Sequence, residues 1–150
     1  MWYNKVVKDL DNLPDFIDHF NDQLNYAKKE CALKGHLEKQ IAALPGITEY
    51  RYNQLQEIEA LLEYMEIQLR RVKQKHYKIF LEGYNKTLSS ADAKKYSEAD
   101  QEVVDYEVLK NEVALLRNRY LGIMKAIESK NFMLGHITRI RSAGLEDIHI

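Results

Sequence analysis

Apolar residues recur at steps of three and four along most of the chain, which is the spacing of one face of an α-helix. The first such pattern begins after Asn12, which can cap a helix, and continues to about Leu44. Gly35 is a weak point within it, and Pro45-Gly46 predicts its end. Its apolar members are Leu13, Phe16, Ile17, Phe20, Leu24, Ala27, Cys31, Leu37, Ile41 and Leu44. Residues 2–11 predict a short helical lead-in.

Two further patterns predict two more long helices. One starts at a possible cap, Thr48, and runs to about Glu82, where Gly83 stops it. Residues 83–97 then form the one long connection, with a single helical turn expected at Ser90. Ser97 opens the string SEAD, a capping box with an Asp at its last position, and predicts a helix from there to about residue 142. With no strand pattern or repeat, the sequence predicts an all-α protein, an elongated bundle or hairpin of three long helices with a short connecting loop segment.

Composition fits one folded domain over residues 1–150. Its 150 residues are 45% hydrophobic and 30% charged, which is typical of a soluble folded chain. We expect an N-terminal helix region (1–46), an acidic-to-basic helix with its loop (47–98) and a C-terminal oligomerisation helix (99–150). Helices this long expose more apolar surface than one chain covers, which favours self-assembly. We expect no membrane span, since no apolar run nears about 20 residues, and a reducing cytosol, since Cys31 has no partner for a disulfide.

Positive charge is concentrated in residues 69–86. This segment has six basic residues and one acidic residue, Glu82, so it carries +5 while the whole chain carries −1. Cations that neutralise phosphates stand there beside rings that can stack on bases, which is the chemistry of a single-strand binding site. The candidate nucleic-acid-binding residues are Arg70, Arg71, Lys73, Lys75, Tyr77, Lys78 and Lys86.

Helical geometry divides the segment into three strips. The strip expected in the core holds Met65, Leu69, Val72, His76 and Ile79. One flank holds Arg71, Lys75 and Lys78, and the other holds Arg70, Lys73, Tyr77, Phe80 and Tyr84. A plain solvated basic face explains the charge equally well, because acidic residues near the start of a helix and basic residues near its end also suit the helix dipole.

Signals for catalysis or metal binding are weak. The chain has no HExxH, Walker or GxGxxG motif and no paired cysteines. Asp15 and His19 are four residues apart, and Glu146 and His149 have the ExxH spacing of di-iron bundles, but such bundles need a second ExxH and two more carboxylates. His76 and His136 lie on apolar strips and are expected to be satisfied core histidines. We therefore expect no enzyme, no metal and no cofactor.

Two blocks of the third helix resemble the UvsY-type recombination mediators of T-even-like phages. The first block is ADQEV at 99–103, and the second is KAIESKNFMLGHITRIR at 125–141. The matched positions are Ala99, Asp100, Glu102 and Val103, then Ala126, Ile127, Ser129, Lys130, Phe132, His136, Ile137 and Arg141. The basic segment is similar too, and the resemblance covers roughly residues 55–144.

The resemblance implies a specific function. Such mediators are non-enzymatic, bind single-stranded DNA, and form a hexameric or heptameric homo-oligomer ring through the C-terminal helix. They help a phage RecA-like recombinase to displace the phage single-strand-binding protein, in recombination, repair and replication in the cytoplasm of the infected host. Carried to this chain, the basic residues of 70–78 would hold phosphates. The residues of the oligomer interface would be Ile127, Phe132, His136, Ile137 and Ile140.

Two other classes of function stay open on the sequence. A phage helical protein-interaction or inhibitor module would show little salt-dependent binding to single strands. A small metal-binding helical enzyme would carry iron or manganese when purified.

Overall fold

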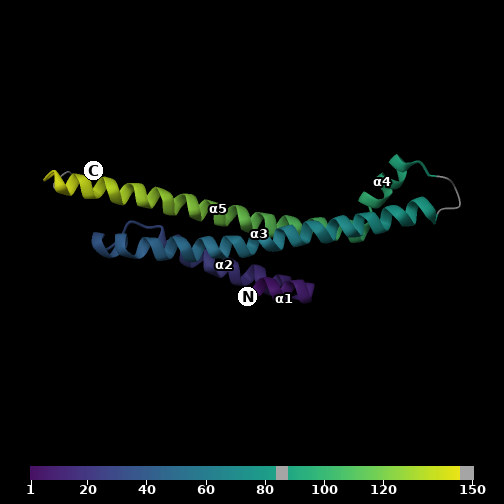
Figure 1. Ribbon diagram of the computed structural model, residues 1–150, viewed down its shortest axis with the longest axis horizontal. Helices are drawn as coiled ribbons and strands as arrows, with labels where there is room; N and C mark the ends of the chain where they lie inside the picture. The colour runs from purple at the N-terminus through teal and green to yellow at the C-terminus, as the bar shows by residue number, and fades with distance from the viewer. Residues whose placement is uncertain (84–87, 146–150) are drawn as a thin grey trace. The chain divides into compact units, whose positions relative to one another are not determined.

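The computed structural model describes residues 1–83 and 88–145, which form helices, turns and loops without a strand (Figure 1). The helices are α1 (Trp2–Lys8), the short 3₁₀ helix η1 (Leu10–Asn12), α2 (Leu13–Glu30), α3 (Leu37–Glu82), α4 (Ser90–Glu98) and α5 (Gln101–Ser142). The prediction of an all-α fold with long helices is confirmed. No helix in the described ranges is long and apolar enough to cross a membrane.

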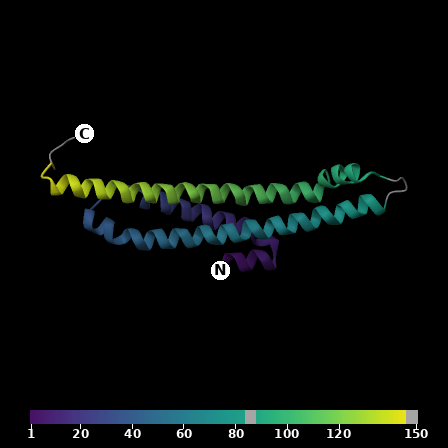
Figure 2. The same cartoon turned by 45° about the horizontal axis from the view of Figure 1, so that its top comes forward.

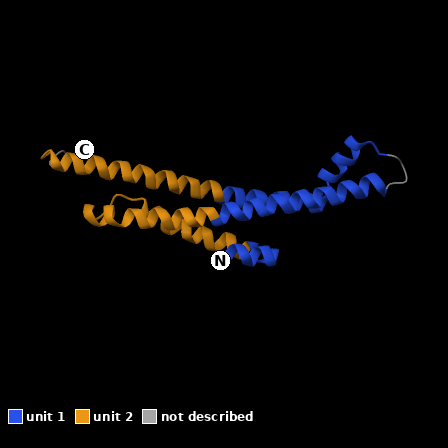
Figure 3. Cartoon of the chain, in the orientation of Figure 1, with its two compact units in different colours: residues 1–13, 57–116 blue, residues 14–56, 117–150 orange. Residues whose placement is uncertain are grey.

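The chain divides into two compact units, coloured separately in Figure 3. Unit 1 comprises residues 1–13 and 57–116, and unit 2 comprises residues 14–56 and 117–150. The long helices α3 and α5 each contribute one part to unit 1 and another part to unit 2.

Unit 2 is a three-helix arrangement of α2, the first part of α3 and the second part of α5 (Figure 2). Its core consists of the residues at three- and four-residue steps: Phe16, Phe20, Leu24, Ala27, Leu44, Leu55, Tyr120, Ile123, Ile127 and Leu134. The Phe20 and Tyr120 rings meet edge to face with centroids 5.9 Å apart. The apolar spacing therefore places one strip of each helix in a shared core.

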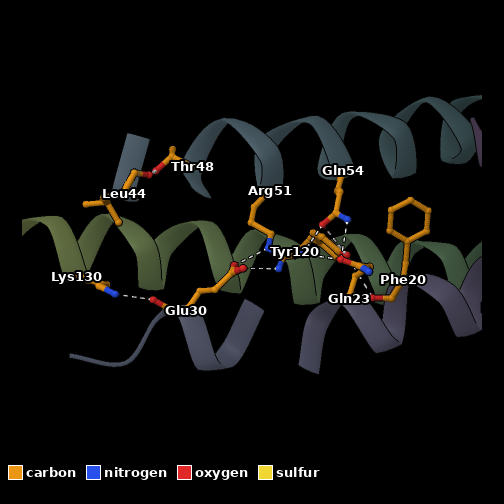
Figure 4. A network of polar contacts seen from close by, with 9 residues as sticks. All are labelled: Phe20, Gln23, Glu30, Leu44, Thr48, Arg51, Gln54, Tyr120 and Lys130. Carbon is orange, nitrogen blue, oxygen red and sulfur yellow. Dashed lines mark hydrogen bonds and ion pairs between the residues drawn. The ribbon is translucent and has the colours of Figure 1, made fainter. Parts of the chain in front are cut away.

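A polar network crosses this core (Figure 4). Arg51 on α3 is 2% exposed and binds Glu30 at the end of α2 through two bonds, Nε to Oε2 at 2.7 Å and Nη2 to Oε1 at 2.8 Å. Its Nη1 donates to Gln54 at 2.8 Å, and Lys130 on α5 donates to the Glu30 carbonyl at 2.7 Å. Because these bonds form only in one alignment, they fix the register of three helices.

Unit 1 packs α1, the second part of α3, α4 and the first part of α5. Its buried apolar residues are Val6, Leu13, Ile58, Leu61, Leu62, Met65, Leu69, Ala93, Val103, Val113 and Leu116. The lead-in helix is tied to α3 because the Tyr3 amide donates to Glu57 at 2.8 Å.

The helix end expected at Pro45-Gly46 and the helix start expected at Thr48 were both wrong. Helix α2 ends at Glu30, and α3 begins at Leu37 and continues through Pro45. The turn lies at Gly35, whose φ of +99° suits glycine alone among common residues. Proline inside a helix costs about 3 kcal/mol, but the buried neighbours Leu44 and Arg51 hold this part of α3 against α2 and α5.

The expected capping role of Ser97 was also wrong. Helix α4 reaches Glu98, so Ser97 lies within it and donates to the Lys94 carbonyl at 2.8 Å. Asp100 takes the cap position instead, because its Oδ1 accepts from the Glu102 amide at 2.9 Å at the start of α5. In the connection expected over 83–97, residues 90–97 belong to α4, which begins after a Ser89 cap on the Asp92 amide at 3.2 Å, while residues 84–87 lie outside the described residues.

Candidate nucleic-acid interface

Residues 69–82 of the basic segment form about the last four turns of α3, in unit 1. The strip of this segment that was expected in the core is buried only at its N-terminal end. Met65 and Leu69 are 0% and 6% exposed, Val72 and His76 are half-buried, and Ile79 is 51% exposed. The prediction that Ile79 faces the core was therefore wrong, and the end of α3 offers much of its circumference to solvent.

Three cations stand on the solvent side of this segment. Arg70, Arg71 and Lys78 are exposed, and none of the ion pairs within residues 1–83 and 88–145 involves them. At 100° per residue they lie within one face of the helix, opposite the buried strip. Nearby Ile67 and Leu81 are 45% and 40% exposed. This face combines positive charge with apolar surface.

Two of the other predicted cations are engaged by acids of α5. Lys73 Nζ lies 2.7 Å from Glu107 Oε1, and Lys75 Nζ lies 3.5 Å from Glu102 Oε2. Exposed pairs of this kind stabilise a fold only slightly. A phosphate can therefore compete for both lysines, but only after displacing a carboxylate.

His76 connects the same segment to the start of α5. Its Nε2 lies 2.7 Å from Glu102 Oε2 and 3.4 Å from Asp100 Oδ1. Hydrogen bonding to His76, together with the nearby Lys75 ammonium, lowers the pKa of the Glu102 carboxyl below its ordinary range. His76 is thus half-buried and satisfied, whereas His136, expected in the core, is exposed.

These groups form one candidate metal cluster in the described part of the chain. The ligand atoms of His76, Asp100 and Glu102 lie within 4.8 Å of one another. Lys75 already supplies positive charge to Glu102, and Asp100 caps α5. The arrangement therefore fits an ion-pair cluster between two helices better than a divalent cation site. Of the sequence candidates, Asp15 is exposed and His19 contacts the Phe20 ring, while Glu146 and His149 lie outside the described residues.

Aromatic rings lie beside the cations, partly from an unexpected element. Tyr77 is half-buried on α3. The Phe80 ring stacks on Tyr96 of α4 with centroids 5.6 Å apart, and Tyr96 is 52% exposed. Tyr84 and Lys86 lie outside the described residues. Sequence reasoning missed Tyr96 because it assigned most of α4 to a loop, although the preceding Lys94 and Lys95 were a signal.

The residues predicted for an oligomer interface fall into two groups. Phe132 is 66% exposed, Ile140 is 42% exposed, His136 is exposed and Ile137 is half-buried. Ile127 is 2% exposed and belongs to the core of unit 2. The outward side of α5 therefore presents apolar residues to solvent, while Ile127 stabilises the bundle itself.

The single cysteine carries no sign of a nucleophile. Cys31 is half-buried after the last turn of α2. Burial, with the negative charge of Glu30 next, raises the pKa of its thiol. A raised pKa keeps the thiol protonated and unreactive at neutral pH.

The fold and this surface define an all-α protein of long paired helices that presents a basic face on one helix. The fold is similar to that of a phage protein, in the crystal structure of the bacteriophage T4 recombination mediator protein UvsY. The two structures match with a TM-score of 0.72 and 19% sequence identity, covering 83% of this chain and 98% of that chain. The resemblance drawn from the sequence is thus confirmed at the level of the fold. No protein-family model and no curated protein sequence matches the chain.

Proposed function

We propose that this chain is a non-enzymatic recombination mediator that binds single-stranded DNA through the basic face of α3. The observation that carries the proposal is the group Arg70, Arg71 and Lys78, exposed and outside every ion pair of the described residues, on the fold of the T4 mediator. A chain of net charge −1 that keeps three unpaired cations on one helix face has a surface suited to a polyanion.

The physical basis of binding is phosphate neutralisation with stacking. Each cation that contacts a phosphate releases condensed counterions, so binding weakens as salt rises. Lys73 and Lys75 extend the same segment and exchange Glu107 and Glu102 for phosphates when a strand is bound. Tyr77 on α3 and Tyr96 on α4 supply rings on which bases stack without sequence preference.

Self-association strengthens a weak site of this size. Three to five phosphate contacts give modest affinity, but several copies on one assembly raise the effective concentration of sites by orders of magnitude. The exposed residues Phe132, His136 and Ile140 of α5 are the surface on which we propose that copies meet. Ile137 lies at its edge.

The proposed partners are those of a mediator. These are single-stranded DNA, a RecA-like phage recombinase and the phage single-strand-binding protein. A strand held along several basic faces is extended and less accessible to a competing single-strand-binding protein, which favours nucleation of a recombinase filament. In this proposal the mediator catalyses no reaction, and the recombinase is the enzyme.

The test is a loading assay with a RecA-like recombinase on DNA covered by single-strand-binding protein. Wild-type protein shortens the lag before strand-stimulated ATP hydrolysis, and the variant Arg70→Ala/Arg71→Ala/Lys78→Ala does not. A variant with three lysines removed elsewhere, Lys28→Ala/Lys34→Ala/Lys39→Ala, is the control for net charge. If wild type leaves the lag unchanged although it binds the strand, the mediator role is refuted. If it does not bind the strand at all, a helical protein-interaction module replaces it.

A further inference from the structure

A pocket in unit 2 opens beside the loop that joins α2 to α3. Its volume is about 500 Å³, which is in the range of pockets that hold a small ligand. The basic residues that line it are Lys29, Lys34, Lys39 and Lys130. Among the described residues that line it, Glu30 is the one acid, and both of its carboxylate oxygens are already bound by Arg51. The four lysines therefore give the pocket a surplus of positive charge.

Lys130 gives the strongest sign of an anionic ligand. It is 7% exposed, and its Nζ donates to the Glu30 carbonyl at 2.7 Å (Figure 4). An ammonium group has three N–H donors, and this bond uses one of them. Buried charges in proteins are paired as a rule, yet no ion pair of the described residues includes Lys130. A buried ammonium that lines a pocket without a counter-ion indicates that an anion enters there.

The start of α3 adds donors at the same place. Gly35, at φ +99°, turns the chain into α3, and Gln40 Nε2 holds this turn by donating to the Gly35 carbonyl at 3.1 Å. The Gln40 amide donates to the His36 carbonyl at 3.1 Å in the first turn of the helix. The amides of residues 37–39 come before it and have no acceptor within the helix. Free amides at the start of a helix favour phosphate groups, so they reinforce the lysines.

The rest of the pocket wall is partly apolar. Lys39, Ala43 and Ile47 follow one another at four-residue steps and so lie along one strip of α3. Ala32 of the loop also lines the pocket. Ala43 is exposed and Ile47 is half-buried, so both leave apolar surface against which a ligand can pack. Cations beside apolar surface suit a ligand that joins phosphates to a sugar and a base.

We propose that this pocket binds the phosphate chain of a small ligand, either a nucleoside triphosphate or an inorganic polyphosphate. Lys34, Lys39 and Lys130 contact the phosphate oxygens. Four cations around one pocket suit several phosphates better than one. A single strand of DNA instead needs cations that follow its backbone along an extended groove. The pocket lies in unit 2 and shares no residue with the basic face of α3 in unit 1, so the inference goes beyond the proposed function.

Isothermal titration calorimetry of the full-length protein with ATP, and separately with inorganic triphosphate, tests the proposal at low salt and without divalent cations. Wild type binds, and Lys34→Ala/Lys39→Ala lowers the affinity by about tenfold or more. Both lysines are exposed, so the fold is retained, which circular dichroism checks. Arg71→Ala/Lys78→Ala is the matched control, because it removes two exposed cations outside the pocket and should keep the wild-type affinity. Ala43→Glu retains every lysine but adds a negative charge to the pocket wall, so it should also weaken binding.

The two ligands distinguish the two sources of phosphate. Tighter binding of ATP than of triphosphate assigns the pocket to a nucleotide, because the apolar wall then contributes, and equal binding assigns it to inorganic polyphosphate. A wild type that binds neither ligand would overturn the proposal, as would an equal loss in the Lys34→Ala/Lys39→Ala variant and its control. Displacement of ATP from Arg71→Ala/Lys78→Ala by oligo-dT would also overturn it, since a strand would then occupy the pocket.

Binding of labelled oligo-dT, measured in parallel, separates failure of this inference from failure of the proposed function. The Lys34→Ala/Lys39→Ala variant should bind the strand as wild type does. A wild type that binds oligo-dT but neither small ligand refutes the pocket alone. A wild type that binds ATP in the predicted way but does not bind the strand refutes the proposed function and leaves the pocket in place.

Discussion

Arg51 shows how one charged side chain determines the packing of unit 2. Burial alone lowers its pKa, but the hydrogen bonds and the charge of Glu30 outweigh this and raise the pKa, so the side chain stays charged. No pattern in the sequence distinguishes it from the solvated arginines. Along α3, Arg51 lies between the buried residues Leu44 and Leu55, and only its partner Glu30, 21 positions earlier, explains a basic residue in this buried strip.

Removing Arg51 should destabilise the protein strongly. Arg51→Ala leaves Glu30 and Gln54 without their main donor inside the bundle and is expected to cost about 3 kcal/mol of the free energy of unfolding. Urea denaturation measures it. Arg70→Ala, at an exposed arginine, is the control and should change that free energy by less than about 0.5 kcal/mol. A loss below about 1 kcal/mol for Arg51→Ala would show that the network does not hold the helices.

The contact between His76 and Glu102 should make stability depend on pH. The pKa of Glu102 is lowered in the folded state from its ordinary value of 4.5. Its stabilising contribution is therefore present above pH 4.5 and is lost as the pH falls through the lowered pKa. We expect wild type to be more stable than Glu102→Gln at neutral pH, with the difference shrinking in acid, as measured by urea denaturation across pH. A difference that grows in acid would contradict this sign.

At the scale of helices, the sequence predicted the three longest helices of the described residues, and the ends expected near Glu82 and residue 142 are confirmed. The boundary between α2 and α3 was misplaced, and most of α4 was assigned to a connection. Apolar spacing identified all three long helices, because the apolar residues of a buried helix strip recur at a period that can be read from the sequence. The position of a break between two helices is decided by competition between the local conformational preference of the residues and tertiary packing. Pro45-Gly46 has the stronger local signal, but Gly35 has the positive φ, and the buried contacts beyond Pro45 decide the outcome.

Gly46 within α3 and Gly83 directly after it should respond oppositely to alanine. At Gly46 an added Cβ meets nothing within 4 Å, so Gly46→Ala should raise the free energy of unfolding by about 1 kcal/mol through helix propensity. At Gly83 the Cβ would lie 2.7 Å from the Ile79 carbonyl oxygen, so Gly83→Ala should lower it. Thermal unfolding of the two variants side by side measures both. Stabilisation by Gly83→Ala would show that the end of α3 is not held as described.

Acids of α5 should restrain the basic face of α3. Glu102→Gln and Glu107→Gln release Lys75 and Lys73, so affinity for a single strand should rise, by up to roughly fivefold for each pair. The salt dependence should steepen as well, because two more cations reach phosphates. Glu112→Gln is the matched control, since it removes the same charge from an exposed position of α5 that no ion pair of the described residues includes. Equal effects of all three variants would indicate net charge rather than release of particular lysines.

At the scale of the whole molecule, function depends on surfaces that the sequence predicted only in part. Residues 70–78 were predicted as one basic site, and the structure separates them into exposed cations and cations paired with α5. That division could not be read from the sequence, because Glu102 and Glu107 are about 30 positions away from their lysines. The same holds for Tyr96, which meets Phe80 only because α4 folds as a helix.

The central claim is that the exposed cations of α3 bind single-stranded DNA, and fluorescence anisotropy of labelled oligo-dT across a salt titration tests it most directly. Wild type should bind at low salt and weaken steeply as salt rises. Arg70→Ala/Arg71→Ala/Lys78→Ala should flatten the slope of log affinity against log salt by about 2, at about 0.7 per lost phosphate contact. Lys28→Ala/Lys34→Ala/Lys39→Ala should retain the wild-type slope. Folded wild type that does not bind at low salt, or an equal loss in both variants, would contradict the account.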